Sequence, residues 1–317
     1  MNSKVMLMAA LAVCGCAEME QQFAPGSEEM VELSFRIPSQ QMTKVSGSVA
    51  EDEVKDLQVF VFGQDGQLHA YGSAEAAQLT LTCSTGDKKV AALVNAPLLN
   101  TVSDETTLRK QISLFSDNSL GRFVMAGIES KKINKTEEVV ISVSRLVSKV
   151  VLTSVKNDFE FVQHRDMQFS IKSIFLTNAA KNKAYYNDSA PTDWYNKGIS
   201  DISQIISQSG NMMYDTFQPV SLAYGKSYES GRFLYCYPNP KLDGAAPTYL
   251  VIEAILEGNT YYYPVALPPM ESNKCYNVSL TIRRPGSATP DVPVDTESAL
   301  FKVEVQPWTY VTVTDTI

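Results

Sequence analysis

VELSFRI, at residues 31–37, is the stretch that decides the fold, because its apolar and polar side chains alternate strictly. A period of two is that of a β-strand with one buried face. Pro38 ends the strand, since proline has no N–H to donate to a ladder. The side chains that we expect to point into a core are Val31, Leu33, Phe35 and Ile37.

Similar short apolar or alternating runs recur along the chain, separated by turn residues roughly every 10 residues, which favours β-sandwiches. Asp65-Gly66 predicts a hairpin turn. A short helix is expected between Leu108 and Leu120, and residues 178–232 are interpreted as a surface excursion with short helices and little strand. We therefore predict an all-β fold with a boundary between two sandwiches near residues 145–155. The predicted strands lie at residues 57–62, 79–83, 90–94, 139–143, 146–155, 169–176, 233–237, 249–256, 260–267, 276–282 and 301–305.

Composition and motifs argue against catalysis. The 317 residues carry a formal net charge of −8, which would repel nucleic acid, and include only two histidines, His69 and His164. No nucleophile elbow, zinc-protease signature, phosphate loop or paired CxxC occurs. We predict a protein that is not an enzyme and has no metal, no cofactor and no nucleic-acid partner.

The first residues resemble a bacterial export signal. Lys4 precedes an apolar run at residues 5–13, which is too short to span a bilayer. VCGC follows at residues 13–16 and is similar to a lipobox, with small Gly15 before Cys16. We expect residues 1–16 to be a lipoprotein signal with Cys16 lipidated; the alternative is an ordinary signal peptide. Residues 17–30 would be a polar tether.

Two cysteines of the second half, Cys236 and Cys275, fall in predicted strands. An exported protein meets an oxidising compartment, so a disulfide between them is one alternative. Separate buried thiols are the other, and spacing along the sequence does not decide between them.

The ordered set of motifs resembles the FimA-type fimbrillins, the type V pilins of Bacteroides-like bacteria. Each motif alone is weak, but their order and spacing behind a lipobox are specific. The matching pieces are Lys55–Phe62 with Gly66 and Leu68, Lys89–Pro97, Ser144–Val150, Tyr261–Val265 with Asn273 and Tyr276, and Val303–Trp308.

The resemblance implies two transthyretin-like Greek-key β-sandwiches in tandem, at residues 31–148 and 149–317. It implies export as a lipoprotein held in the outer membrane through Cys16, then cleavage by an arginine- or lysine-specific protease. Residues 31–44, with the first strand, would be removed. A C-terminal strand of another subunit would fill the groove, giving homo- or heteropolymeric surface fimbriae for adhesion and biofilm formation.

Two basic residues could mark the cleavage site, and the remaining alternative is no cleavage, as in anchor subunits that keep their lipid. Lys44 lies in the predicted loop and is preferred by position, whereas Arg36 has the expected chemistry but lies inside the strand. The donor strand is expected at residues 309–317, which alternate and can detach at the end of the chain. The donor residues expected in place of the removed strand's apolar side chains are Val311, Val313 and Ile317.

The alternative function is binding, by a tip adhesin or a monomeric glycan-binding surface lipoprotein, with a host or bacterial surface receptor as partner. Its motivation is an aromatic group that could stack on sugars, although such rings also anchor a long loop onto a sandwich. The group comprises Tyr185, Tyr186, Trp194 and Tyr195.

Overall fold

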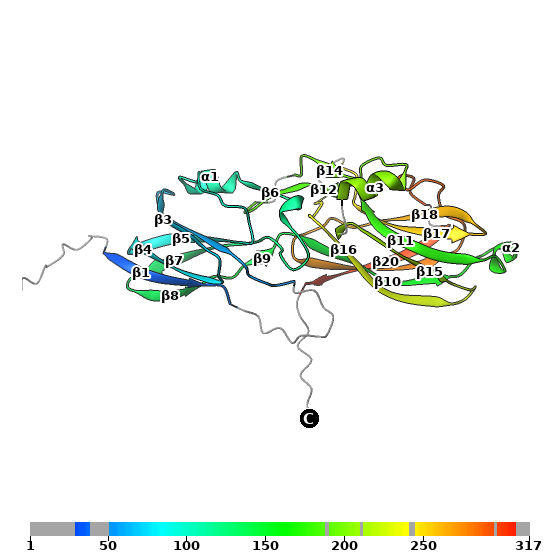
Figure 1. The fold of residues 1–317 in the computed structure, drawn as a ribbon, viewed down its shortest axis with the longest axis horizontal. Helices are drawn as coiled ribbons and strands as arrows, with labels where there is room; N and C mark the ends of the chain where they lie inside the picture. The colour runs from blue at the N-terminus through cyan, green and yellow to red at the C-terminus, as the bar shows by residue number, and fades with distance from the viewer. Residues whose placement is uncertain are drawn as a thin grey trace, which may run out of the picture.

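The computed structural model describes residues 29–38, 51–187, 190–209, 212–240, 245–294 and 297–308. Its strands form two stacks of sheets that lie end to end along the longest axis (Figure 1). The stack that contains β1 is called the N-terminal sandwich, and the other the C-terminal sandwich. The predicted all-β class is confirmed, since the helices are few and short.

The N-terminal sandwich pairs a three-stranded with a five-stranded sheet. The smaller sheet has the order β4 (Gln78–Ser84), β1 (Met30–Arg36), β8 (Glu137–Val140). The larger sheet has the order β3 (Leu68–Ala74), β2 (Leu57–Phe62), β5 (Gly86–Val94), β7 (Met125–Ile133), β9 (Ser144–Arg145).

Strand β2 is buried on both faces, which explains why its sequence reads as a continuous apolar run rather than an alternation. Leu57, Val59 and Val61 face the three-stranded sheet and pack with β1. Phe60 and Phe62 point to the opposite face and belong to a second hydrophobic cluster, which extends into the C-terminal sandwich. The hydrophobic packing is thus continuous from one stack of sheets to the other.

The C-terminal sandwich consists of two four-stranded sheets with a shared core. The first has the order β16 (Ser227–Cys236), β10 (Ser148–Asn157), β19 (Lys274–Ile282), β20 (Ala299–Pro307). The second has the order β15 (Tyr214–Ser221), β11 (Phe169–Thr177), β17 (Tyr249–Leu256), β18 (Asn259–Ala266).

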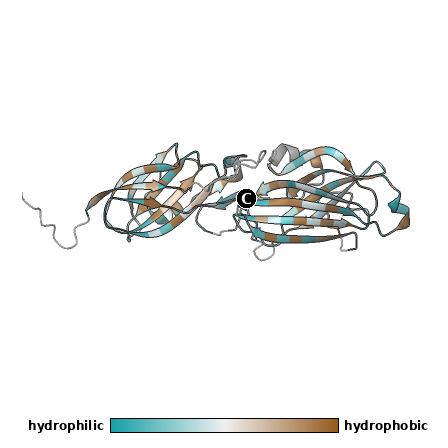
Figure 2. Cartoon of the chain, turned by 90° about the horizontal axis from the view of Figure 1, so that it is seen from below, coloured by the Kyte–Doolittle hydropathy of each residue, from teal (hydrophilic) through white to brown (hydrophobic). Residues whose placement is uncertain are grey.

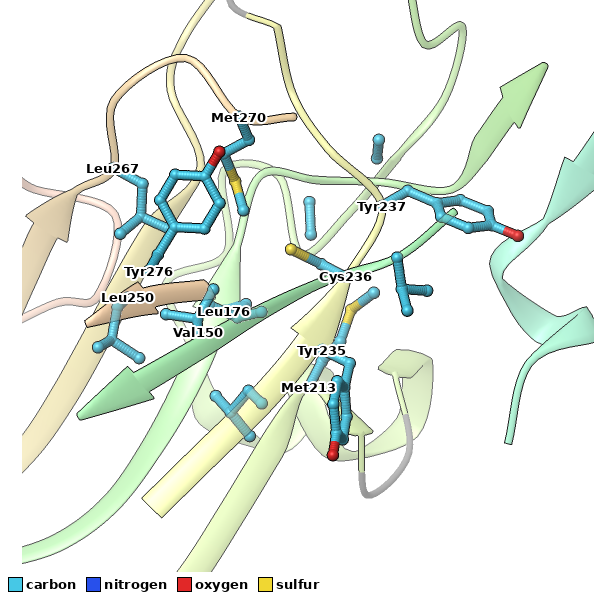
Figure 3. Packing of buried hydrophobic residues seen from close by; sticks show 14 of the residues in the cluster. Val150, Leu176, Met213, Tyr235, Cys236, Tyr237, Leu250, Leu267, Met270 and Tyr276 are labelled. Atoms are coloured by element: carbon cyan, nitrogen blue, oxygen red, sulfur yellow. The ribbon is translucent and has the colours of Figure 1, made fainter. Parts of the chain in front are cut away.

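Alternating side chains of both sheets fill this core. Figure 3 shows Val150 and Tyr276 of the first sheet near Leu176 and Leu250 of the second, all buried. The same alternation of hydrophobic and hydrophilic residues follows the strands of both sandwiches in Figure 2.

Short elements connect the two stacks. Strand β6 (Ile112–Leu114) pairs with β13 (Asn182–Ala184), and β12 (Ala179–Ala180) pairs with β14 (Trp194–Tyr195). The described part of the chain contains the helices α1 (Glu105–Arg109), α2 (Val162–Arg165) and α3 (Ile202–Ser209) and a 3₁₀ turn at Phe115–Asp117.

Two sequence predictions need correction. In place of the helix expected between Leu108 and Leu120, α1 spans Glu105–Arg109 and a 3₁₀ turn follows at Phe115–Asp117. Asp104 fixes the earlier start of α1, because its side chain accepts from the Thr107 N–H at 2.8 Å. The region 178–232 contains more strand than expected, since β15 is a full edge strand of the second sheet. Most of its side chains are exposed or half-buried, so its sequence lacks the apolar signal of a core strand.

Candidate functional site

Strand β1 occupies the centre of the three-stranded sheet, so both of its backbone edges are paired. It runs antiparallel to β4 and parallel to β8, with Phe35 opposite Leu79 on one side and Val139 on the other. Hydrogen bonds extend past both ends of the β4 ladder, from the Ile37 N–H to the Ala77 carbonyl at 3.0 Å and from the Thr85 N–H to the Glu29 carbonyl at 2.7 Å. Without β1, two strand edges would lose their partner.

The inward face of β1 is an integral part of the core. Leu33 and Phe35 are fully buried, and Val31 and Ile37 are 6% and 4% exposed. Burying a side chain of this size contributes about 1.5–3 kcal/mol, so the four together contribute roughly 6–12 kcal/mol. That sum is comparable with the whole stability of a domain, about 5–15 kcal/mol. The apolar neighbours of these four side chains come from both sheets and are Leu57, Val59, Val61, Leu79, Cys83, Val90, Ala92, Val94, Met125, Ile133, Val139 and Ile141.

The outward face of β1 is polar. The Arg36 guanidinium donates from Nε to the Glu138 carboxylate of β8, and both side chains are about half exposed, at 44% and 50%. The backbone of Arg36 is paired on both sides, with Gln78 of β4 and Val140 of β8. Arg36 is thus accessible only through its side chain.

Several of the predicted site residues lie outside the described residues. These are the predicted lipidation site Cys16, the predicted cleavage site Lys44, and the predicted donor residues Val311, Val313 and Ile317. The described chain ends at Trp308, directly before the predicted donor strand.

Strand β20 leads to that point and differs from β1. It lies at the edge of its sheet and pairs only with β19 among the described strands. Its apolar side chains Leu300, Phe301 and Val305 are exposed. Ala299, at the start of β20, is buried in the core, and Val303 packs partly against it.

Trp308 is anchored in a cluster where the two sandwiches meet, called here the junction cluster. Its members are Glu51, Asp52, Arg145, Lys149, Tyr235, Asn273 and Trp308. The buried Glu51 carboxylate accepts hydrogen bonds from Lys149 Nζ at 2.7 Å, the Tyr235 hydroxyl at 2.5 Å and the Trp308 indole N–H at 3.0 Å.

Arg145 forms the second half of the junction cluster. It pairs with Asp52 and donates to Asn273 Oδ1 at 2.8 Å, and its guanidinium lies 4.4 Å from the centroid of the Trp308 ring. The cluster therefore joins Glu51 and Asp52, which follow the predicted cleavage site Lys44, to Trp308, which precedes the predicted donor strand. Sequence reasoning missed it, because Glu51 and Asp52 stand in a polar stretch that was interpreted as loop. The signals were Arg145 and Lys149 within the motif at 144–150, together with Asn273 and Trp308 of the later motifs.

Residues 31–159 match the family model described as major fimbrial subunit protein (FimA). The resemblance to FimA-type fimbrillins is confirmed. The matched FimA region includes β1, its neighbours β4 and β8, and Arg145 of the junction cluster.

Solved structures share the fold across most of the chain. A candidate cell adhesion protein from Bacteroides eggerthii has a TM-score of 0.65 at 18% identity, covering 90% of this chain and 97% of its own. A second such protein, from Parabacteroides distasonis, has a TM-score of 0.66 at 16% identity and covers 89% of this chain and 100% of its own. A FimA fimbrilin from Porphyromonas gingivalis has a TM-score of 0.62 at 16% identity and covers 88% of this chain and 97% of its own. No curated protein matches the chain.

The cysteines of this chain stand apart. Cys236 is opposite Ser148 and Cys275 opposite Lys149, on the two strands that flank β10. Strands on either side of a shared neighbour are roughly 9–10 Å apart. That distance exceeds the roughly 7 Å between Cα atoms that a disulfide can span. Cys236 and Cys275 are separate thiols. Burial raises the pKa of the Cys236 thiol to about 12.

Burial also raises the pKa of several tyrosine hydroxyls. It raises the pKa of Tyr185 to about 12, and it raises the pKa of Tyr237 further. These hydroxyls therefore stay protonated near neutral pH. Across the described residues, no group of three or more His, Cys, Asp or Glu side chains could hold a metal ion. In the same ranges no helix is long and apolar enough to cross a membrane.

Proposed function

We propose that the chain is a structural fimbrial subunit that is exported as a lipoprotein through Cys16 and matured by a protease at Lys44. It then polymerises head-to-tail by strand exchange into surface fimbriae for adhesion and biofilm formation. One observation carries the proposal: a complete core strand, β1, comes from the residues that precede the predicted cleavage site.

The physical case rests on what the loss of β1 would leave. Four apolar side chains would vacate the core, and the facing edges of β4 and β8 would be unpaired. Exposed strand edges and an apolar groove are unstable in water, and an added strand satisfies both. Another subunit's strand would complete the sheet, and repetition of a head-to-tail contact gives a filament.

Cleavage at Lys44 is favoured over Arg36. A protease binds its substrate in an extended form with free backbone groups, whereas the backbone of Arg36 is paired with strands on both sides. Cleavage at Lys44 would also release β1 whole, together with Ile37, which is buried with it.

The aromatic group offers little support for the glycan-binding alternative. Tyr185 is buried, and the Tyr186 hydroxyl donates to the Ala92 carbonyl of β5 at 3.0 Å. These two rings anchor the 178–195 region onto the N-terminal sandwich and are not free to stack on a sugar.

Expression of the chain in an export-competent Gram-negative host tests the proposal. Wild type, Cys16→Ala and Lys44→Ala would be compared for fatty-acid labelling, for the N-terminal residue of the surface protein, and for polymers on native gels. We expect labelling that needs Cys16, a mature start at residue 45, and polymers only after cleavage. Polymers from the uncleaved Lys44→Ala form, or a mature start far outside residues 37–45, would contradict it.

A further inference from the structure

We propose that the groove beneath β1 selects a donor strand from a different fimbrial subunit and discriminates against this chain's own residues 309–317. The preferred donor has a large apolar side chain at the Phe35 position and a basic residue directly after it. The inference rests on the proposed strand exchange and specifies the partner for that site.

The inner wall of the groove has four side-chain positions, and the middle two are the most demanding. The positions of Leu33 and Phe35 are fully enclosed, and their neighbours in the cluster are all apolar apart from the thiol of Cys83. A charged group placed there has no partner and costs several kcal/mol. A small side chain at the Phe35 position leaves a cavity, which is also destabilising.

This chain's own segment does not meet those demands. In a donor strand, Val311, Val313, Asp315 and Ile317 would share one face, because strand side chains alternate. If Val311 takes the place of Val31, Asp315 takes the place of Phe35. The carboxylate would then lie in the largest apolar position of the groove.

Other registers do not remove the conflict. A shift by two residues in one direction puts Asp315 at the Leu33 position, which is equally enclosed. The opposite shift puts Val313 at the Phe35 position and leaves it underfilled. A strand inserted in the reverse direction places Asp315 at the Leu33 position. Shifting that reversed strand by two residues moves Asp315 to a neighbouring inward position, with the same cost of a buried charge or an underfilled site. A slip by one residue turns the threonines inward instead.

The outer face adds a weaker preference. Arg36 donates to Glu138, and removal of β1 takes this basic partner away. With Val311 at the Val31 position, the outward residues of the chain's own segment would be Tyr310, Thr312, Thr314 and Thr316, none of which is basic. A donor with Lys or Arg at the Arg36 position would restore the pair, although a half-exposed ion pair changes affinity only a few-fold.

A graft in the intact chain tests the inner wall without any assembly step. In one variant, residues 31–37 are replaced by VTVTDTI, the sequence of 311–317. Its matched control, VTVTFRI, differs only by keeping Phe35 and Arg36. We expect a folded-to-unfolded ratio of the N-terminal sandwich at least about 100-fold lower in the first than in the control. Equal urea midpoints would overturn the inference.

Peptide exchange tests the partner directly. The purified chain is cleaved at Lys44 and mixed with labelled peptides: residues 29–38 as a positive control, residues 309–317, and residues 309–317 carrying Asp315→Phe and Thr316→Arg. We expect the substituted peptide to bind at least about 30-fold more tightly than the unsubstituted one. Binding of the two within threefold would overturn the inference and indicate a homopolymer. Failure of the 29–38 peptide to bind would instead contradict strand exchange itself.

A charge reversal isolates the outer-face preference. Peptides with Asp315→Phe and either Thr316→Arg or Thr316→Glu are compared on wild-type protein and on the Glu138→Lys variant. The preference of a few-fold for the Arg peptide should reverse on the variant. An unchanged preference would show that Glu138 does not select the donor.

Discussion

Strand β1, the candidate for removal, and strand β20, which leads to the proposed donor segment, are held in opposite ways. Strand β1 is central, pairs on both edges and buries an entire apolar face. Strand β20 lies at an edge, pairs only with β19 in the described part of the chain, and exposes Phe301 and Val305. Burial of apolar side chains therefore stabilises the strand in the acceptor groove, whereas the edge strand that leads to the donor segment contributes little to its own core.

This difference gives the proposed assembly a direction. A groove that has lost roughly 6–12 kcal/mol of burial is driven to accept a strand. A segment that follows an exposed edge strand can be presented without dismantling a core. Trp308 fixes where that segment begins, because its indole N–H and ring are both held within the junction cluster.

The largest expected effect comes from truncating a ring on each strand. Phe35→Ala should lower the free energy of unfolding by about 3–5 kcal/mol, because it leaves a cavity in a closed core. Phe301→Ala on β20 should cost less than about 1 kcal/mol, because the ring is already exposed. Urea unfolding followed by circular dichroism measures both. Equal losses would contradict the contrast between the two strands.

The junction cluster should give an intermediate effect. Glu51→Ala removes the acceptor of three hydrogen bonds, and the Lys149 ammonium loses the carboxylate with which it pairs. We expect a loss of about 2–4 kcal/mol, since hydrogen bonds to charged groups contribute about 1.5–3 kcal/mol each and are not additive. Glu53→Ala, at a half-exposed carboxylate two residues on, is the control and should be nearly neutral. A neutral Glu51→Ala would show that the cluster does not anchor the junction.

A smaller effect is expected for the indole N–H alone. Trp308→Phe keeps an aromatic ring beside Arg145 and Tyr235 but removes the donor to Glu51. We expect a loss of about 1–3 kcal/mol, the cost of an unsatisfied buried acceptor. Thermal unfolding of the variant measures this loss. If the loss is as large as for Trp308→Ala, packing of the indole rather than its hydrogen bond is the main contribution.

The smallest effect should come from the outward face of β1. Arg36→Gln breaks the pair with Glu138, and the two side chains are 44% and 50% exposed. The expected change in stability is below about 1 kcal/mol and should shrink further in high salt. A loss as large as that of Phe35→Ala would mean that β1 is held by its outer face, not by its core side chains.

Sequence patterns predict strands well where apolar side chains alternate or run continuously, and poorly where few side chains are buried. The alternation at residues 31–37 predicted β1, because one buried face imposes a period of two. Strand β15 was missed because most of its side chains are exposed or half-buried, so no apolar pattern marks it. The junction cluster was missed for another reason. Its members lie as far apart in sequence as Glu51 and Trp308, and only the tertiary fold brings them together.

The most direct test of the central claim uses Cys83 as a reporter of the groove. This thiol is buried on β4 directly opposite Val31 of β1, whereas Cys236 is buried in the C-terminal sandwich and serves as an internal control. Alkylation at each cysteine, followed by mass spectrometry, would be compared in the intact chain, in a chain that begins at residue 45, and in that chain with the residue 29–38 peptide added.

The account predicts that Cys83 is protected in the intact chain, reactive in the shortened chain and protected again by the peptide. Cys236 should stay unreactive throughout, since burial raises its pKa to about 12 and keeps the thiol protonated. A shortened chain in which Cys83 remains protected without any added strand, or remains reactive when the peptide is present, would contradict the claim that β1 fills an exchangeable groove.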